Sequence, residues 1–182
     1  MSNLNHVVLD LEALGTSPGC GILSIALMPM NPAEIHQFYG ACYYASNAEA
    51  GLTTDPSTAY WWSAPERATL WQEFTDPEDD SVTTLIHRFS CWLTATQKLV
   101  PNMRIWGNGA LFDWGILEAA ARKLRIPLEF DTRHVMCYRT LKVLRPDIKM
   151  PPFVGIPHFA PHDAANEARH LKLLLNAISG DM

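Results

Sequence analysis

The sequence predicts an α/β fold, a mixed sheet with helices on both faces, and three observations support this prediction. Three short apolar or alternating segments near the N-terminus are joined by short, turn-forming connections, which indicates antiparallel strands. Longer segments with apolar residues at helical spacing follow them. A further short apolar segment lies between two of the helical ones. Antiparallel strands followed by alternating helices and strands are typical of a sheet covered by helices.

The expected strands comprise residues 6–12, 21–30, 35–44 and 103–106. The expected helices comprise residues 56–74, 81–96, 110–124, 132–144 and 163–178, with a new helix beginning at Pro65. Many prolines mark residues 146–161 as a loop. No linker rich in proline and glycine separates two cores, so residues 1–182 are expected to form one domain.

The composition excludes several classes of protein. Hydrophobic residues make up 48% of the 182 residues and charged residues 18%, which excludes a disordered chain. The net charge of −5 argues against an architectural nucleic-acid binder, which needs a large basic excess. An enzyme that holds nucleic acid through metal ions remains compatible, because cations reverse the local sign of a carboxylate cluster.

Cysteine usage and the N-terminus predict a cytoplasmic protein. The four cysteines form no CxxC pair, so we expect buried thiols in a reducing compartment rather than a zinc site. The N-terminus has no basic n-region of a signal peptide. The longest apolar stretch, residues 22–30, is too short to cross a bilayer, so no membrane association is expected.

Two acids on the first expected strand are the most informative feature. Side chains alternate along a strand, so Asp10 and Glu12 share one face while Leu9 and Leu11 share the other. Neighbouring acids on an apolar strand repel each other and lose hydration, and a divalent cation such as Mg²⁺ or Mn²⁺ would compensate them. From this pair alone, a strand end exposed to water is an equally good interpretation.

Two further motifs follow along the chain. Asp113 lies in the first turn of an expected helix, after a strand and a glycine turn around Asn108. Alone, it is most simply an acid that favours a helix N-terminus. His162 precedes Glu167 by five residues at the start of the last helix. Alone, His162 is most simply a surface histidine.

Taken in order, the three motifs resemble the DEDD superfamily of 3′–5′ exonucleases in its histidine variant, DEDDh. The resemblance extends from residue 10 to residue 168. Residues 8–18, 59–62 and 106–113 are most similar to a small branch of bacterial and phage 3′–5′ exoribonuclease-like proteins. The resemblance implies an RNase H-like fold and the hydrolysis of single-stranded RNA or DNA from its 3′ end, with RNA favoured, to nucleoside 5′-monophosphates.

The resemblance also implies the roles of the acids. Asp10, Glu12, Asp113 and Glu167 would hold two divalent cations, Mg²⁺ or Mn²⁺, about 3.5–4 Å apart. His162 would accept the proton of the attacking water. The fourth acid of the family is an aspartate, and Glu167 departs from that pattern.

A second register of the last motif restores the aspartate. His158 precedes Asp163 by the same five residues. We rank this register lower, because Ala164 and Ala168 fit the helix that follows the histidine when the histidine is His162.

Contacts with the substrate are predicted from the same resemblance. In relatives the turn that corresponds to Leu14, Gly15 and Thr16 holds the 3′-terminal nucleotide, and Asn108 is a further candidate. Trp61 and Trp62 are candidates for base stacking, although consecutive residues of a helix point about 100° apart, which favours burial of one of them. A basic segment is either a phosphate track or a solvated face; it contains Arg133, Arg139, Lys142, Arg145 and Lys149.

Two other functions stay open at this point. Glu167 in place of an aspartate is compatible with a catalytically weak nuclease-like module that binds nucleic acid or a protein. The acids are also compatible with a metal-dependent phosphoesterase that acts on small nucleotides. Similar proteins dimerise, so a homodimer is compatible with the resemblance.

Overall fold

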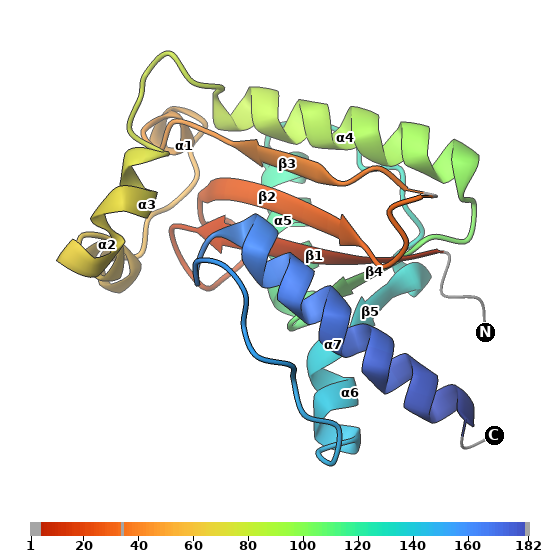
Figure 1. Cartoon of the computed structure of the whole chain (residues 1–182). Helices are drawn as coiled ribbons and strands as arrows, with labels where there is room; N and C mark the ends of the chain where they lie inside the picture. Colours follow the sequence, from red (N-terminus) through yellow and green to blue (C-terminus); the bar gives the residue numbers. More distant parts are fainter. Residues whose placement is uncertain (1–4, 34, 181–182) are drawn as a thin grey trace.

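A computed structural model describes residues 5–33 and 35–180, and one five-stranded sheet forms its centre (Figure 1). The strand order is β3-β2-β1-β4-β5. β1, β2 and β3 pair antiparallel, whereas β4 runs parallel to β1 and β5 runs parallel to β4. The strands are β1 (His6–Ala13), β2 (Ile22–Pro29), β3 (Phe38–Ala41), β4 (Arg104–Gly107) and β5 (Val135–Cys137).

The helices begin where the sequence provides starting signals. Asp55 accepts a hydrogen bond from the Ser57 N–H at the start of α2, and Ser81 accepts one from the Thr84 N–H at the start of α4. The α-helices are α1 (Ser46–Glu49), α2 (Pro56–Trp62), α3 (Ala68–Gln72), α4 (Val82–Leu99), α5 (Ala110–Lys123), α6 (Tyr138–Leu144) and α7 (Ala160–Gly180). Two short 3₁₀ turns are η2 (Pro65–Arg67) and η3 (Thr132–His134).

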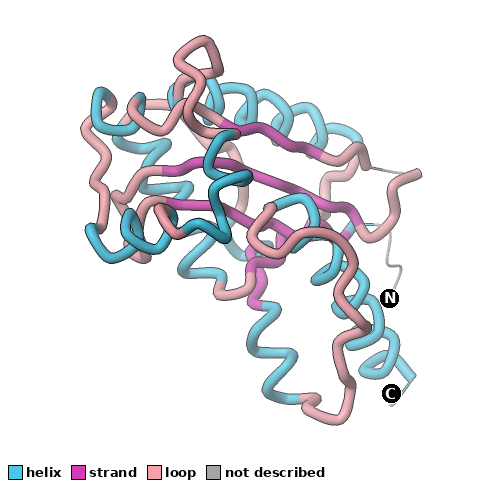
Figure 2. The backbone as a smooth tube through the Cα atoms, turned by 60° about the vertical axis from the view of Figure 1, so that its left-hand side comes forward, coloured by secondary structure: helices cyan, strands magenta, loops and turns pink. Residues whose placement is uncertain are grey.

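Helices cover both faces of the sheet, as the sequence predicts. Figure 1 shows α7 in front of the strands and α5 behind them, and Figure 2 shows helical segments on both sides of the strands. Val7, Leu9 and Leu11 of β1 are buried in one apolar cluster with residues of α4 and α5. Val8 is buried in a second cluster with residues of α6 and α7. The predicted mixed sheet with three antiparallel N-terminal strands is therefore confirmed.

The segment predicted as a helix over residues 132–144 is only partly helical, which corrects the prediction. Val135–Cys137 forms the edge strand β5, because it pairs in parallel register with Ile105–Gly107 of β4. Helical spacing in the sequence is overridden there by pairing with a distant strand. The last helix also begins at Ala160 rather than at residue 163.

A third, smaller apolar cluster attaches α2 and α3 to the edge of the sheet near the end of β1. Leu14, Leu23, Trp62 and Phe74 are buried in it. The Trp62 Nε1–H donates to the carbonyl of Ala13 at 3.1 Å. This bond ties α2 directly to the strand that carries the first two acids.

None of the helices in the described part of the chain combines the length and the hydropathy that a membrane span needs.

Candidate active site

The first two acids lie where β1 loses one of its neighbours. The parallel pairing of β1 with β4 ends at Leu9 opposite Gly107, and β1 continues toward Glu12 paired with β2. Asp10 lies opposite Ala26, and Glu12 lies opposite Ser24. Both cross-strand neighbours are small, so the face above the acids stays open to side chains from other elements.

Asp113 approaches this place from the first turn of α5. Its side chain is buried at 2% exposure. A Cβ atom on Gly107 would lie 2.6 Å from Asp113 Oδ2, so only glycine at the end of β4 leaves room for this carboxylate. Gly109 adopts a φ of 126°, which side-chain-bearing residues rarely tolerate. The glycine turn thus directs the Asp113 carboxylate toward β1.

Helix α7 supplies two further acids. Asp163 and Glu167 are one turn apart and therefore lie on the same face of the helix. Ala160, Ala164 and Ala168 are buried in the cluster that contains Val8 of β1, and their small side chains allow α7 to approach the sheet closely. The five acids of the site thus come from β1, α5 and α7.

His158 lies beside these acids. One ring nitrogen of His158 and one carboxylate oxygen each of Glu12 and Asp163 all lie within 4.8 Å of one another. His158 has a φ of 63°, a conformation uncommon for residues other than glycine. Its side chain is exposed. The second register of the last motif is therefore the one that forms a cluster able to hold a metal ion.

His162 contacts the loop before α7 instead. Its Nδ1 accepts a hydrogen bond from the Ile156 N–H at 2.9 Å. The Asn166 side chain bonds both the N–H and the carbonyl of Val154, at 3.0 and 2.8 Å. These contacts hold the loop that presents His158.

The carboxylates strongly influence one another. Burial raises the pKa of Asp10 well above its usual value, and the charges of Glu12, Glu167, Asp113 and Asp163 raise it further. Burial, followed by the charges of Asp163 and Asp113, raises the pKa of Glu12 to about 9. Because Asp10 is coupled to all four other acids, the five side chains form one electrostatic unit.

Cations of α6 only partly compensate this unit. Burial raises the pKa of Asp113 to about 7, although Arg139 and the backbone of Asn108 lower it. Burial, followed by the charge of Asp113, raises the pKa of Glu167 to about 8, and Lys142 opposes this increase. Glu167 itself is buried at 6% exposure.

Two carboxylate oxygens of the site lack a partner. Within the described residues, Asp113 Oδ2 and Glu167 Oε2 are buried and accept no hydrogen bond. Buried carboxylates without partners are costly, and oxygen-rich clusters of this kind bind hard divalent cations. The residues present therefore fit divalent metal ions.

A family model described as the 3′–5′ exoribonuclease Rv2179c-like domain matches residues 5–178. The chain belongs to this family. No curated protein matches the chain in sequence.

A solved structure supports the same assignment at the level of the fold. It is described as the nuclease domain of 3′hExo, a DEDDh family member, bound to rAMP. The TM-score is 0.60 at 14% identity, over 96% of this chain and 92% of that chain. The family model confirms the predicted 3′–5′ exonuclease family, and the likeness to a DEDDh nuclease domain confirms the predicted RNase H-like fold.

In this Rv2179c-like domain, the turn at residues 14–16, which follows Glu12, has few exposed side-chain atoms that a substrate could contact. Leu14 is 2% exposed, and its N–H and carbonyl bond Gly21 and Asp55. The Cβ position of Gly15 is blocked by Cys20 at 2.8 Å. Of the three predicted residues, Thr16 is the exposed one.

The other predicted substrate contacts are largely occupied. Trp62 is 1% exposed, so its ring is not accessible to a base. Trp61 is half-buried, and its ring lies against His158. The Asn108 side-chain oxygen accepts a hydrogen bond from Lys142 at 2.9 Å, and its carbonyl accepts one from Arg139 at 2.6 Å.

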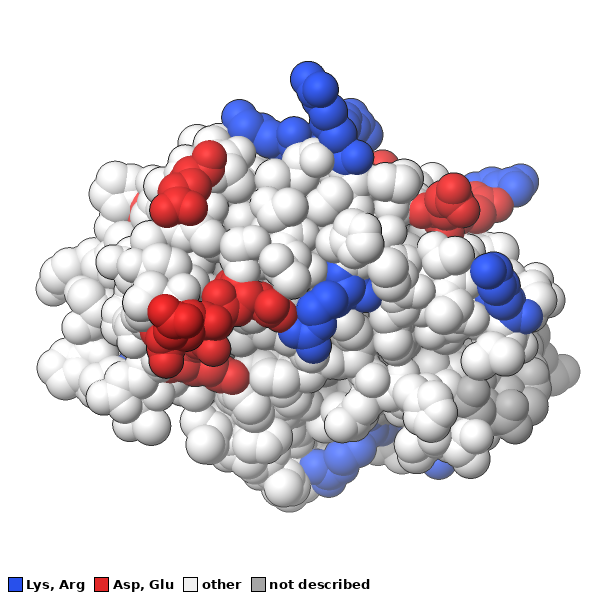
Figure 3. All heavy atoms as spheres, turned by 90° about the horizontal axis from the view of Figure 1, so that it is seen from above, with Lys and Arg blue, Asp and Glu red and all other residues white. Residues whose placement is uncertain are grey.

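The basic segment is divided by the structure. Arg133 forms an ion pair with Asp131, and Arg145 forms one with Asp147. Arg139 and Lys142 instead bind the turn next to the acids. Figure 3 shows the molecule from above, the side on which Figure 1 places α4, and that face carries both acidic and basic side chains, whereas α6 lies at the opposite side. Sequence reasoning thus identified the basic segment but not which of its cations border the site.

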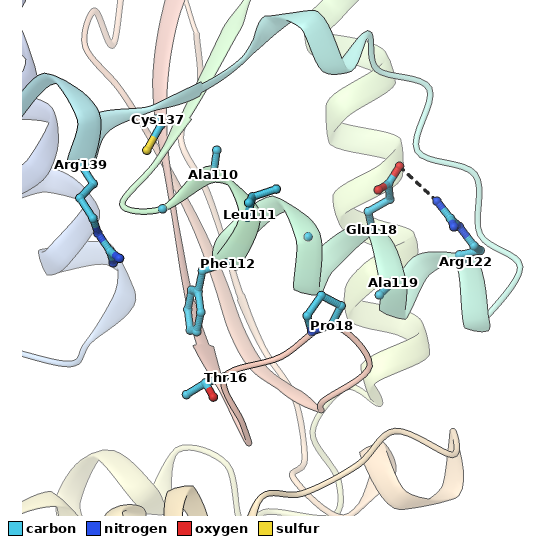
Figure 4. A pocket seen from close by; sticks show the side chains of 12 residues that line it. Thr16, Pro18, Ala110, Leu111, Phe112, Glu118, Ala119, Arg122, Cys137 and Arg139 are labelled. Carbon is cyan, nitrogen blue, oxygen red and sulfur yellow. Dashed lines mark ion pairs between the residues drawn. The ribbon is translucent and has the colours of Figure 1, made fainter.

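A pocket of about 910 Å³ borders the site on the α5 side (Figure 4). The β1–β2 turn contributes Thr16 and Pro18, and the start of α5 contributes Leu111 and Phe112. Arg139 lies across from them. Arg139 connects this largely apolar pocket to the acids, because it lines the pocket and its charge lowers the pKa of Asp113.

Proposed function

We propose that this protein is a metal-dependent 3′–5′ exonuclease that hydrolyses terminal phosphodiesters of single-stranded nucleic acid to nucleoside 5′-monophosphates, with RNA favoured over DNA. The observation that carries the proposal is the convergence of acids from β1, α5 and α7 beside His158. Family membership and the fold support the same chemistry.

Four carboxylates are assigned to hold the ions: Asp10, Glu12, Asp113 and Asp163. When bound, divalent cations lower the pKa of a water molecule and stabilise charge on the phosphate. Glu167 lies one turn behind Asp163 on α7, and its charge acts on Asp10. Its buried Oε2 has no hydrogen-bond partner within the described residues, so Glu167 is the alternative fourth ligand, and the comparison of Asp163→Asn with Glu167→Gln decides between the two.

His158 is assigned as the general base. Its ring adjoins Glu12 and Asp163, and its exposure leaves it accessible to a substrate and the attacking water. A neutral imidazole can accept the proton of that water near neutral pH. His162 is less suited to this role, because its Nδ1 is engaged by the Ile156 N–H. We therefore prefer His158 with Asp163 to His162 with Glu167.

The pocket beside Asp113 is assigned to the terminal nucleotide. Phe112 offers an aromatic surface for a base, and Arg139 offers a cation for a phosphate. The neighbouring structure was solved with rAMP, a ribonucleotide, which supports RNA as the favoured substrate.

The experiment is a time course on a labelled single-stranded oligonucleotide with Mg²⁺, with Mn²⁺ and with a chelator. We expect hydrolysis from the 3′ end with either ion, none with chelator, and none for Asp10→Asn. His158→Ala should lower the rate by about 10²- to 10⁴-fold, the usual contribution of a general base. Hydrolysis by Asp10→Asn at the wild-type rate would refute the proposal.

His162→Ala is the matched control for the base. Both variants remove an imidazole near the start of α7, but we expect His162→Ala to act only through the loop and to lose much less activity. The reverse order of the two variants would restore His162 as the base. Asp163→Asn compared with Glu167→Gln tests the fourth acid in the same way, with the larger loss expected for Asp163→Asn.

A further inference from the structure

The ring of His158 is held by an aromatic contact rather than by a hydrogen bond. The centroids of the His158 and Trp61 rings are 4.8 Å apart, and their planes meet at 84°. Within the described part of the chain, no hydrogen bond is made by the His158 ring. An edge-to-face contact at this distance is a favourable aromatic arrangement. Trp61 is therefore the aromatic side chain placed to influence the orientation of the imidazole.

Trp61 itself is fixed from two directions. The Arg67 guanidinium lies over the Trp61 ring at 3.8 Å from its centroid, and Arg67 Nε donates to the Trp61 carbonyl at 2.5 Å. The next residue, Trp62, is buried and bonded to Ala13 at the end of β1. Trp61 is thus connected to β1, which carries Glu12, through its neighbour Trp62, and it contacts His158 with its own ring.

The loop around His158 needs such a support. His158 is exposed and adopts a left-handed backbone conformation. On its other side the loop is held by Phe159, whose ring packs against Tyr39 of β3 at 5.5 Å. That contact fixes the backbone but leaves the imidazole free to rotate about its own side-chain bonds. The Trp61 ring is placed where it restricts this rotation.

We propose that Trp61, which Arg67 holds in place, is a positioning residue that orients the His158 imidazole toward the acids of the site. The inference rests on the proposed role of His158 as general base. It assigns Trp61 to the rate of the chemical step rather than to base stacking, because Arg67 and His158 already occupy its ring.

The test compares kcat and KM of Trp61→Ala with those of wild type on the same oligonucleotide. Loss of orientation should lower kcat by about tenfold to 100-fold with little change in KM, because small misplacements of a catalytic group are costly. Trp61→Phe keeps an aromatic ring and should recover most of the lost rate. Tyr60→Ala is the matched control, since Tyr60 is the preceding residue of α2 and 81% exposed.

A double-mutant cycle separates positioning from a general structural role. If Trp61 acts through His158, Trp61→Ala should cause no further loss in the His158→Ala background. A structural defect would lower the residual rate of that background by the same factor again. The urea midpoint of each variant shows whether the fold is retained, and Trp61→Phe keeps the test valid if Trp61→Ala unfolds.

Two outcomes would overturn the inference. An increase in KM with unchanged kcat would mean that Trp61 stacks on a base. An equal effect of Trp61→Ala with and without His158 would mean that it only supports the fold. Failure of the proposed function would be recognised separately, because wild type would then be inactive or His158→Ala fully active, and the role of Trp61 would fall with it.

Discussion

Removing the charge of Glu167 should stabilise the metal-free protein at high pH. Glu167 is buried beside Asp113, and one of its oxygens has no partner within the described residues. Its folded-state pKa of about 8 exceeds the ordinary 4.5, so the folded protein binds a proton that the unfolded chain releases. Stability contributed by this proton is present below pH 4.5 and is lost as the pH rises through about 8. Glu167→Gln keeps the shape and removes this loss.

The pKa difference sets the size of the effect. The gap between about 8 and 4.5 corresponds to about 5 kcal/mol at about 1.4 kcal/mol per pKa unit. Lys142 loses an attractive charge in the variant, which reduces the gain. We therefore expect Glu167→Gln to exceed wild type by about 2–5 kcal/mol in free energy of unfolding at pH 9, and by much less at pH 5.

The assay is urea unfolding with a chelator present at both pH values. Glu129→Gln serves as the control, because Glu129 is exposed. The free energy of unfolding of this variant should equal that of wild type at both pH values. Equal or lower stability of Glu167→Gln at pH 9 would refute the reasoning. Repeating the measurement with Mn²⁺ adds a second comparison, since an ion that binds the folded state stabilises it. We expect this gain to persist in Glu167→Gln and to be lost in Asp163→Asn.

Three other changes test separate parts of the structure. Gly107→Ala places a methyl group 2.6 Å from Asp113 Oδ2, so hydrolysis should fall at least about tenfold while circular dichroism stays native; wild-type rates would contradict this geometry. Burial lowers the pKa of His6 from 6.5 to about 4, so stability should fall by up to about 3 kcal/mol as the pH drops through that range, and His6→Gln should abolish this slope in urea titrations. Arg139→Ala should raise KM and reduce the slope of log KM against log salt by about one, and an unchanged slope would remove Arg139 from the phosphate contacts.

The strands and helices with strong local patterns could be predicted, whereas an element made by pairing could not. Continuous apolar runs predict the strands β1 and β2, and apolar residues at every third or fourth position predict the helix α4. β5 has only three residues between helix-forming segments, and it exists as a strand because β4 lies beside it. No local pattern carries that information.

Asp10, Glu12 and Asp113 are the same in the sequence prediction and in the proposal, whereas the proposal prefers His158 and Asp163 to the predicted His162 and Glu167. His158 with Asp163 and His162 with Glu167 have the same spacing and are offset by four residues, about one turn of a helix. The choice depends on where α7 begins and on which imidazole the preceding loop engages. The expected burial of one of the two tryptophans agrees with the structure, in which Trp62 is buried and Trp61 is half-buried. What Trp61 touches depends on the loop, which is distant in sequence.

The docking of α7 on β1 couples the site to the completion of folding. Asp10 and Asp163 come from opposite ends of the described chain, and the helix that carries Asp163 also closes one apolar layer over Val8. Forming contacts this far apart in sequence has a large entropic cost of loop closure, which slows folding. Without α7 docked on the sheet, the apolar layer over Val8 would be open, and the acids of α7 would be missing from the site. The proposed hydrolysis therefore requires that α7, from the C-terminal part of the chain, is docked on β1, from the N-terminal part.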